Sequence, residues 1–401
     1  MKAELSVDRP KSHRPKVRNR ASKERGLPRL RHFATEYLVA LPFGALIALT
    51  WANTDAESYY RLVQPAAFLV NDVAMVAFFA LITKEIVEAT APGGVLHPWR
   101  HAALPVFASL GLATVPVVLF SFLARVLGEP MLVRGWTTVL AVDIALGYFA
   151  ARIIFGKHPA TAFFLLLAIS ANGLGFIALA IVDPIKEIRW DAAIPLMLGA
   201  IGAALVLRRA EVRNFWPYVI VAGGLSWSAL FVGGFHPALA LLPIVPFIPH
   251  ASRDPGFFVD APARAADALN RFELWLRHPA QVALFGFGLV NGGVAFGALE
   301  AGIWSLPLAT LVGKPVGLLL GVSLGTALGL HLPRGVRWRD LVPVGFISAA
   351  GFTMALFFAT ATIGPGQILS ELNMGAVLSV GSCIVAVGVA RLLGAGTFGH
   401  R

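Results

Sequence analysis

Two ionisable side chains lie near the middle of long apolar runs. Asp143 is in TTVLAVDIALGYFAAR and Lys314 is in LPLATLVGKPVGLLLG. A charge in the hydrocarbon core costs about 2.5–3.5 kcal/mol on insertion scales, and residues that bear one are commonly functional. A carboxylate at that depth can hold either a cation or a proton. The two residues therefore predict an ion or proton site, with a structural ion pair between two helices as the alternative.

Three more residues in apolar surroundings are secondary candidates. Asp72 lies early in FLVNDVAMVAFFALITKEIVE, where it could instead steady a helix end. Glu85, beside Lys84, lies late in the same run, where both side chains could reach the membrane interface or pair with loop charges. His236 in GGFHPALALLPIVPF is either a hydrogen-bonding group at a helix end or a pH-sensitive group.

Neutral polar residues interrupt two other apolar runs. Ser170 and Asn172 lie in LLLAISANGLGFI, and Thr353 lies in PVGFISAAGFTMALFF. Hydroxyl and amide oxygens can ligate a cation, although an amide cannot take up a proton. We therefore expect Asn172, Ser170 and Thr353 to supply neutral oxygens beside Asp143 and Lys314.

Motifs for enzymatic chemistry are absent from the sequence. Gly313-Lys314 is not a phosphate-binding loop, because the first glycine of that motif is missing and Pro315 replaces its hydroxyl residue. No group of His, Cys and acidic residues has metal-ligand spacing, and no nucleophile elbow is present. The single cysteine, Cys383, excludes an intrachain disulfide. We expect neither an enzyme nor a cofactor.

The elements that must position these residues are membrane-spanning helices. The 401 residues are 57% hydrophobic and 14% charged, whereas soluble domains have about 45–50% apolar and about 25% charged residues. Apolar runs recur from about residue 34 to the end, and a spanning helix needs about 20 such residues. We predict an all-α polytopic membrane protein with twelve spans, near 34–52, 66–87, 102–126, 134–155, 160–182, 192–208, 215–232, 234–250, 279–298, 303–330, 341–362 and 373–395.

The basic residues predict the orientation of these spans. Residues 1–32 form a strongly basic tail without an apolar stretch, and we expect it to be disordered along an anionic cytoplasmic surface. Lys and Arg gather in the tail and in the loops on its side of the membrane, so both termini are expected in the cytoplasm. The basic charge belongs to the tail, so it does not indicate nucleic-acid binding. The loops and flanks on the other side hold Arg61, Arg125, Arg134, Lys186 and Arg189.

One membrane domain, 33–401, follows the tail. Its longest polar connection, 251–278, links the eighth and ninth spans, and its second half, 261–277, has an amphipathic pattern expected at the membrane interface. The fourth and eleventh spans each contain small and polar residues near their middle. Interrupted helices at matched positions indicate a transporter site at mid-membrane, with small-residue helix packing as the alternative.

Several of these motifs resemble those of the NhaA-type sodium/proton antiporters, in the same order and over most of residues 34–395. The similar segments are FLVNDVAMVAFFALITKEIVE, LAVDIALG, GGFHPALALLPIVPFIP, HPAQVALFGFGLVNGGV, LVGKPVGLLLG and GFISAAGFTMALFFATATI. The resemblance implies twelve helices with inverted repeats, in which the fourth and eleventh helices are broken and cross. It also implies exchange of Na⁺ or Li⁺ for protons in a bacterial inner membrane, as a possible homodimer.

The sequence departs from the family at the fifth helix. The family carries two adjacent aspartates there, in an Ile-Asp-Asp-Leu-Gly context, whereas this chain has Ile-Ser-Ala-Asn-Gly-Leu-Gly at 169–175. No acid remains between Asp143 and Asp183. In the family the lysine that corresponds to Lys314 pairs with a helix-five acid. We therefore expect Asp143 and Lys314 to be coupled across the site, with Na⁺ held at Asp143 and Asn172.

Three functions remain open from the sequence. The first is a divergent cation/proton antiporter with an atypical ion site at Asp143 and Lys314. The second is a sensor or scaffold that keeps the transporter fold without exchange. The third is a transporter of another solute, such as an anion attracted to Lys314 and to helix N-termini.

Overall fold

A computed structural model describes residues 39–90, 103–156, 158–181, 188–249, 267–294, 296 and 301–399. Within these ranges the regular elements are helices, without strands. Six helices are long and apolar enough to cross a membrane, and two bent helix pairs raise the number of spans to as many as eight by length and composition. Two shorter apolar helices, Ala40–Thr54 and Tyr218–Gly233, add to these. The all-helical polytopic membrane fold is therefore confirmed. The basic tail, 1–32, lies outside the described residues.

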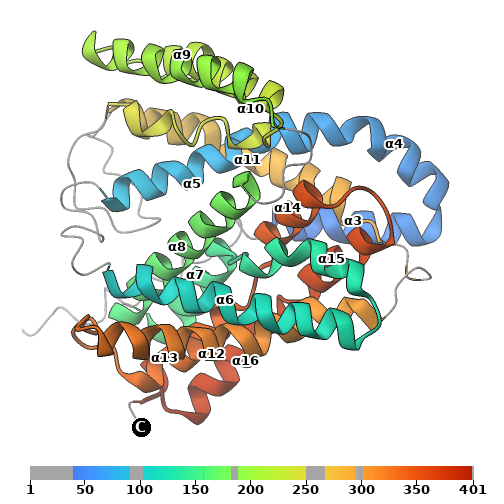
Figure 1. Ribbon diagram of the computed structural model, residues 1–401, viewed down its shortest axis with the longest axis vertical. Coiled ribbons are helices and arrows are strands. Elements are labelled where there is room, and N and C mark those ends of the chain that lie inside the picture. The colour runs from blue at the N-terminus through green and yellow to red at the C-terminus, as the bar shows by residue number, and fades with distance from the viewer. Residues whose placement is uncertain are drawn as a thin grey trace, which may run out of the picture.

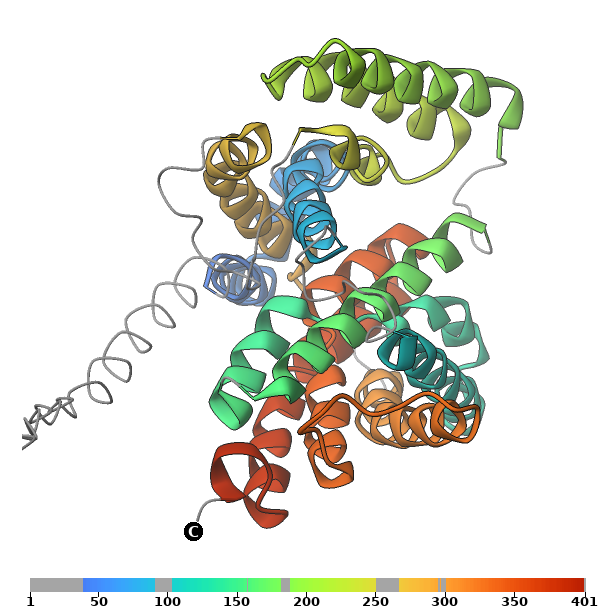
Figure 2. The same ribbon diagram turned by 90° about the vertical axis from the view of Figure 1, so that its left-hand side faces the viewer.

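The helices form two groups, which Figure 2 shows side by side. The first group, here called the panel, consists of α3 (Ala40–Thr54), α4 (Ala56–Phe68), η2 (Leu69–Ala74), α5 (Met75–Thr90), α9 (Trp190–Arg209), η4 (Tyr218–Ala222), α10 (Gly223–Gly233), η5 (Pro237–Leu239), η6 (Val245–Phe247) and α11 (Ala268–Asn291). The second group, here called the core bundle, consists of α6 (Ala103–Val126), η3 (Pro130–Leu140), α7 (Ile144–Phe155), α8 (Pro159–Ile181), η8 (Ala301–Trp304), α12 (Ser305–Ala327), α13 (Trp338–Ser348), α14 (Phe352–Thr362), α15 (Gln367–Leu378), α16 (Gly381–Leu392) and η9 (Gly396–Gly399).

Along the seam between the two groups the described helix backbones do not approach closely, although buried apolar side chains of both groups pack together there. Among the described residues, every extensive helix pairing lies within one group, such as α3 with α11 in the panel or α6 with α12 in the core bundle. The core bundle draws its helices from 103–181 and 301–399, so two distant parts of the chain build it together (Figure 1). Interfaces with few contacts between separately packed units permit relative motion.

Small residues make the closest helix contact inside the core bundle. Gly111 on α6 faces Gly317 on α12, and a Cβ atom added at Gly317 would collide with the Gly111 carbonyl oxygen. Gly321 approaches the backbone of Ala108 in the same way. Side chains of this size let two backbones touch, which is a common way to pack helices in lipid. The α6–α12 contact thus holds the two parts of the core bundle together.

Two segments differ from the sequence-based prediction. The expected eighth span, 234–250, is not a helix: it contains only the short 3₁₀ turns η5 and η6. The proline residues in that run, beginning with Pro237, remove backbone donors and prevent a continuous helix. The expected interfacial stretch, 261–277, is also corrected, because α11 runs unbroken from Ala268 through the ninth apolar run. Residues 261–266 lie outside the described residues.

The two interrupted helices are confirmed. The fourth apolar run consists of η3 and α7, which meet at an angle of 59°. The eleventh consists of α13 and α14, which meet at 48°. The breaks are three residues long, 141–143 and 349–351.

Candidate ion site at the crossing of two broken helices

The two breaks lie against each other. The Asp143 backbone N–H donates to the Ala350 carbonyl at 2.8 Å, which joins the first break to the second. A Cβ atom on Gly351 would lie 3.2 Å from the Ala141 carbonyl oxygen, so the glycine permits the close crossing. Four half-helix ends therefore meet here: two C-termini, of η3 and α13, and two N-termini, of α7 and α14.

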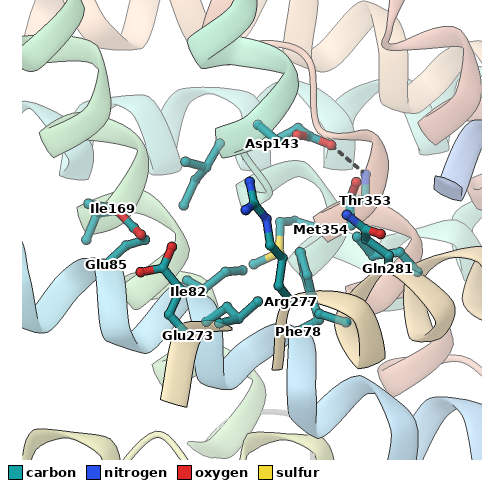
Figure 3. A pocket seen from close by; sticks show the side chains of 15 residues that line it. Phe78, Ile82, Glu85, Asp143, Ile169, Glu273, Arg277, Gln281, Thr353 and Met354 are labelled. Carbon is teal, nitrogen blue, oxygen red and sulfur yellow. Dashed lines mark hydrogen bonds between the residues drawn. The ribbon is translucent and has the colours of Figure 1, made fainter. Parts of the chain in front are cut away.

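Asp143 interacts with both N-termini. One carboxylate oxygen accepts from the Leu146 backbone N–H at 2.9 Å, which caps α7. The other accepts from the Thr353 backbone N–H at 3.0 Å, in the first turn of α14 (Figure 3). Helix N-termini carry unsatisfied N–H groups and a partial positive charge, so they stabilise a carboxylate. Asp143 is 3% exposed and still has free lone pairs on both oxygens for a cation or a proton.

Lys314 interacts with both C-termini. Its ammonium donates to the Ala141 carbonyl oxygen and, at 2.9 Å, to the Ser348 carbonyl oxygen. The side chain is completely buried on α12. Helix C-termini carry unsatisfied carbonyl groups and a partial negative charge, which a cation stabilises. The alternative of a structural ion pair does not hold: among the described ion pairs none joins Asp143 and Lys314, because each binds a different set of helix ends. Coupling of the two residues across the site stays a prediction.

Asn172 lies on α8 beside the first break. Its amide oxygen accepts from the Val142 backbone N–H at 2.9 Å, and its amide nitrogen donates to the Val142 carbonyl at 2.8 Å. Ser170, two positions earlier, donates to the Leu166 carbonyl within its own helix at 2.8 Å. The structure thus brings Asn172 to the crossing, whereas the Ser170 hydroxyl is occupied by the backbone of α8.

Two cavities reach Asp143 from within the seam. The first, of about 70 Å³, lies between α5 and α11 of the panel and α7, α8 and α14 of the core bundle. Asp143 and Thr353 line one end of it, and Glu85 and Glu273 line the other, with Arg277 between them (Figure 3). A volume of this size holds a few water molecules. The first cavity therefore extends from the carboxylate to the two glutamates through a mostly apolar lining.

The second cavity, of about 290 Å³, approaches Asp143 and Thr353 from α3 and α15. Its walls are mostly apolar and include Leu41, Gly292 and Val377. Asp143 and Thr353 are thus common to both cavities.

Near the second cavity a hydrogen bond crosses the seam. The Asn373 amide of α15 donates to the Asn291 carbonyl at the end of α11, at 2.9 Å. The Asn291 side chain is paired within the panel, where its amide donates to the Asn71 amide oxygen at 2.9 Å. Aromatic rings also meet across the seam, since Phe79 of α5 and Phe357 of α14 have centroids 4.4 Å apart.

Glu85 belongs to a charged cluster rather than to the crossing. Lys84 is surrounded by Glu85 at 3.2 Å, Glu88 at 2.8 Å and Glu273 at 2.8 Å. The Lys84 side chain is 5% exposed and the acids are partly exposed. Lys84 therefore does not reach out to the interface but holds α5 against α11.

Asp72 and His236 lie in the panel. Asp72 is in the π-helical segment η2, and its carbonyl accepts from the Trp227 indole at 3.0 Å. His236 begins η5, where its Nδ1 accepts from the Ala238 N–H at 3.4 Å, so it does make a helix-end hydrogen bond. The same nitrogen lies 3.9 Å from an Asp72 carboxylate oxygen. Neither residue lines the two cavities.

The sequence analysis did not identify two kinds of group that take part in the site. The carbonyl groups that bind Lys314 have no side-chain signature. Glu273 and Arg277, on the first turns of α11, were assigned to a surface stretch. Their spacing of four residues on one helix face was the available signal.

Crossed broken helices with a buried carboxylate and a buried lysine, set within a polytopic helical bundle, define the fold as that of a secondary membrane transporter. A family model described as Na+/H+ antiporter 1 matches residues 33–393. The chain belongs to this Na⁺/H⁺ antiporter family.

Named relatives and a solved structure agree with this assignment. A protein of Geobacter metallireducens named Na(+)/H(+) antiporter NhaA is 41% identical over 370 residues, which cover 89% of this chain and 96% of the relative. A protein of the same name from Geobacter sulfurreducens is 38% identical, with the same coverage. The sodium proton antiporter MjNhaP1 of Methanocaldococcus jannaschii is 15% identical and matches with a TM-score of 0.57 over 93% of this chain and 97% of that one, a likeness of fold.

Proposed function

We propose that this protein exchanges a monovalent cation, Na⁺ or Li⁺, for protons across a bacterial inner membrane, with Asp143 as the carrier group. The observation that supports this most is the position of Asp143 in both cavities. A group that a substrate must reach alternately from two sides has to border both routes. Among the described residues it is the only carboxylate that lines both cavities.

The binding step follows from the local geometry. Each Asp143 oxygen accepts one backbone N–H, so the carboxylate is held in place before a cation arrives. A cation and a proton compete for the remaining lone pairs, which makes binding of one release the other. Thr353 lies within reach to add an oxygen, and Asn172 retains a second lone pair on its amide oxygen.

Alternating access follows from the seam. Close helix pairing occurs within the panel and within the core bundle, whereas the two groups meet mainly through apolar side chains. A shift of one group against the other could therefore close one cavity while the other opens, with the crossing kept intact. We assign the first cavity, with Glu85 and Glu273, to the cytoplasmic side, because the basic loops and tail favour a cytoplasmic location for both termini.

The geometry of Lys314 argues against an anionic solute. Its ammonium faces the carbonyl groups of both breaks, and the residue lines neither cavity. An anion that entered either cavity would meet the Asp143 carboxylate instead, which repels it. The site thus favours a cation. The family's homodimer is a further expectation for this chain.

The exchange is tested in proteoliposomes with an imposed pH gradient and a trapped fluorescent pH indicator. Addition of Na⁺ or Li⁺ should dissipate the gradient, and Asp143→Asn should abolish the response. Asp191→Asn removes an exposed acid outside the site and serves as the matched control. Absence of any response of the native chain to Na⁺, Li⁺ or K⁺ between pH 6 and 9 would exclude the antiport function and favour a sensor or scaffold.

A further inference from the structure

Asn172 forms a closed hydrogen-bonded pair with the backbone of a single residue, Val142. Its amide accepts from the Val142 N–H at 2.9 Å and donates to the Val142 carbonyl at 2.8 Å. Val142 is the central residue of the first break, where the backbone has no helical partners of its own. Asn172 is 2% exposed, and Val142 is fully buried. Helix α8 therefore supplies, through one side chain, the two hydrogen bonds that the helix lacks at this point.

The residues on either side of Val142 make the decisive contacts of the site. Ala141 presents its carbonyl to Lys314, and Asp143 presents its carboxylate to Thr353. The Val142 N–H lies in the peptide unit that carries the Ala141 carbonyl, and the Val142 carbonyl lies in the peptide unit that leads into Asp143. Rotation of the first unit would turn the Ala141 carbonyl away from Lys314, and rotation of the second would turn Asp143 away from its partners.

Only a neutral group with one donor and one acceptor fits this role. A carboxylate at position 172 would put a second acceptor against the Val142 carbonyl, whereas a protonated carboxylic acid could make both hydrogen bonds. Alanine would leave a buried N–H and a buried carbonyl without partners. The next residue, Gly173, has no such role to lose by substitution with alanine, because a Cβ atom there would meet no atom within 4 Å.

We infer that Asn172 is a positioning residue: its amide clamps the two peptide units that flank the Val142 Cα and thereby orients the Asp143 carboxylate for cation binding. This role rests on the proposed exchange at Asp143. It also explains the amide in this stretch of α8. The amide both donates and accepts a backbone hydrogen bond, whereas an ionised acid could only accept. In this chain α8 supplies the framework of the site, and Asp143 supplies the charge.

The test compares Asn172→Ala and Asn172→Asp with Gly173→Ala as the matched control on the same helix. Proteoliposome assays give the apparent KM for Na⁺ and the maximal rate as functions of pH. Loss of two buried hydrogen bonds in Asn172→Ala should raise KM by about tenfold or more at every pH. Asn172→Asp should resemble the native chain at low pH, where the acid is protonated, and resemble Asn172→Ala at high pH. Gly173→Ala should retain the native KM.

Hydrogen–deuterium exchange of the segment around Val142 provides a readout that does not depend on transport. The Val142 amide should exchange about tenfold faster in Asn172→Ala, and Asn172→Asp should lose protection as the pH rises, relative to Gly173→Ala. Unchanged exchange in Asn172→Ala would refute the clamp. Faster exchange with an unchanged KM and pH profile would refute the positioning role. If the native chain shows no transport, the proposed function fails, while the exchange experiment still decides on the clamp.

Discussion

The hydrogen bond from Asn373 to the Asn291 carbonyl ties the panel to the core bundle beside the second cavity. If the two groups move against each other during transport, this bond must break. A buried neutral hydrogen bond contributes about 1 kcal/mol net, which corresponds to about a fivefold change in an equilibrium constant. Asn373→Ala should therefore raise the population with an open seam about fivefold.

Cysteine accessibility measures this population directly. Val377 lines the second cavity, so Val377→Cys can be introduced after the single native thiol is removed with Cys383→Ser. The labelling rate with a bulky, charged maleimide is then followed in detergent, where the reagent reaches both sides. The Val377→Cys protein that also carries Asn373→Ala should be labelled about five times faster than the Val377→Cys protein that keeps Asn373. The reason is that the reagent enters only when the seam opens.

A matched control separates the seam from general loosening. Asn71→Ala also deletes an amide hydrogen bond to Asn291, but that bond lies inside the panel. It should leave the labelling rate close to that of the parent. Equal acceleration by Asn71→Ala and Asn373→Ala, or no acceleration by Asn373→Ala, would refute the idea that the Asn373 bond resists opening.

Three further substitutions test the packing and the charges. Lys314→Met keeps the volume but removes two charge-assisted hydrogen bonds, so we expect a loss of about 3 kcal/mol, seen as a lower Tm in detergent; an unchanged Tm would contradict the assigned contacts. Lys84→Met leaves three carboxylates without their cation. The loss of Tm relative to the native chain should therefore be largest at neutral pH and shrink in acid as the carboxylates protonate. A loss of Tm that does not depend on pH would count against the cluster. Gly317→Ala forces a Cβ atom into the Gly111 backbone, so overpacking should cost about 1–3 kcal/mol, whereas Gly199→Ala, with open space around it, should change Tm little.

The sequence identifies charges in apolar runs better than it identifies their partners. Asp143 and Lys314 stand out because a charge at mid-depth is rare, and the interrupted fourth and eleventh runs indicate helix breaks. The partners of Lys314 are carbonyl groups of Ala141 and Ser348, whose side chains carry no trace of that role. These acceptors come together only where the two broken helices cross in the folded protein, so side-chain types in the sequence do not reveal them.

Two errors have a plain physical origin. Hydropathy alone cannot distinguish a helix from a buried turn, so the apolar run 234–250 was predicted as a span although Pro237 and the prolines after it argue for turns. The amphipathic start of α11 was assigned to the surface, yet Glu273 and Arg277 line the first cavity. A polar face inside a membrane protein can border water in its interior, and sequence periodicity does not tell which water it faces.

The two charges of the crossing also constrain how the chain is made. Asp143 comes from the first part of the core bundle but binds the backbone of Thr353, and Lys314 comes from the second part but binds the backbone of Ala141. Each part therefore contributes a charged side chain that binds the backbone of the other part. Synthesis runs from the N-terminus, so Asp143 is made more than two hundred residues before its partner in α14. The ion site is therefore completed only after α14 has been synthesised, and until then the Asp143 carboxylate lacks the Thr353 N–H.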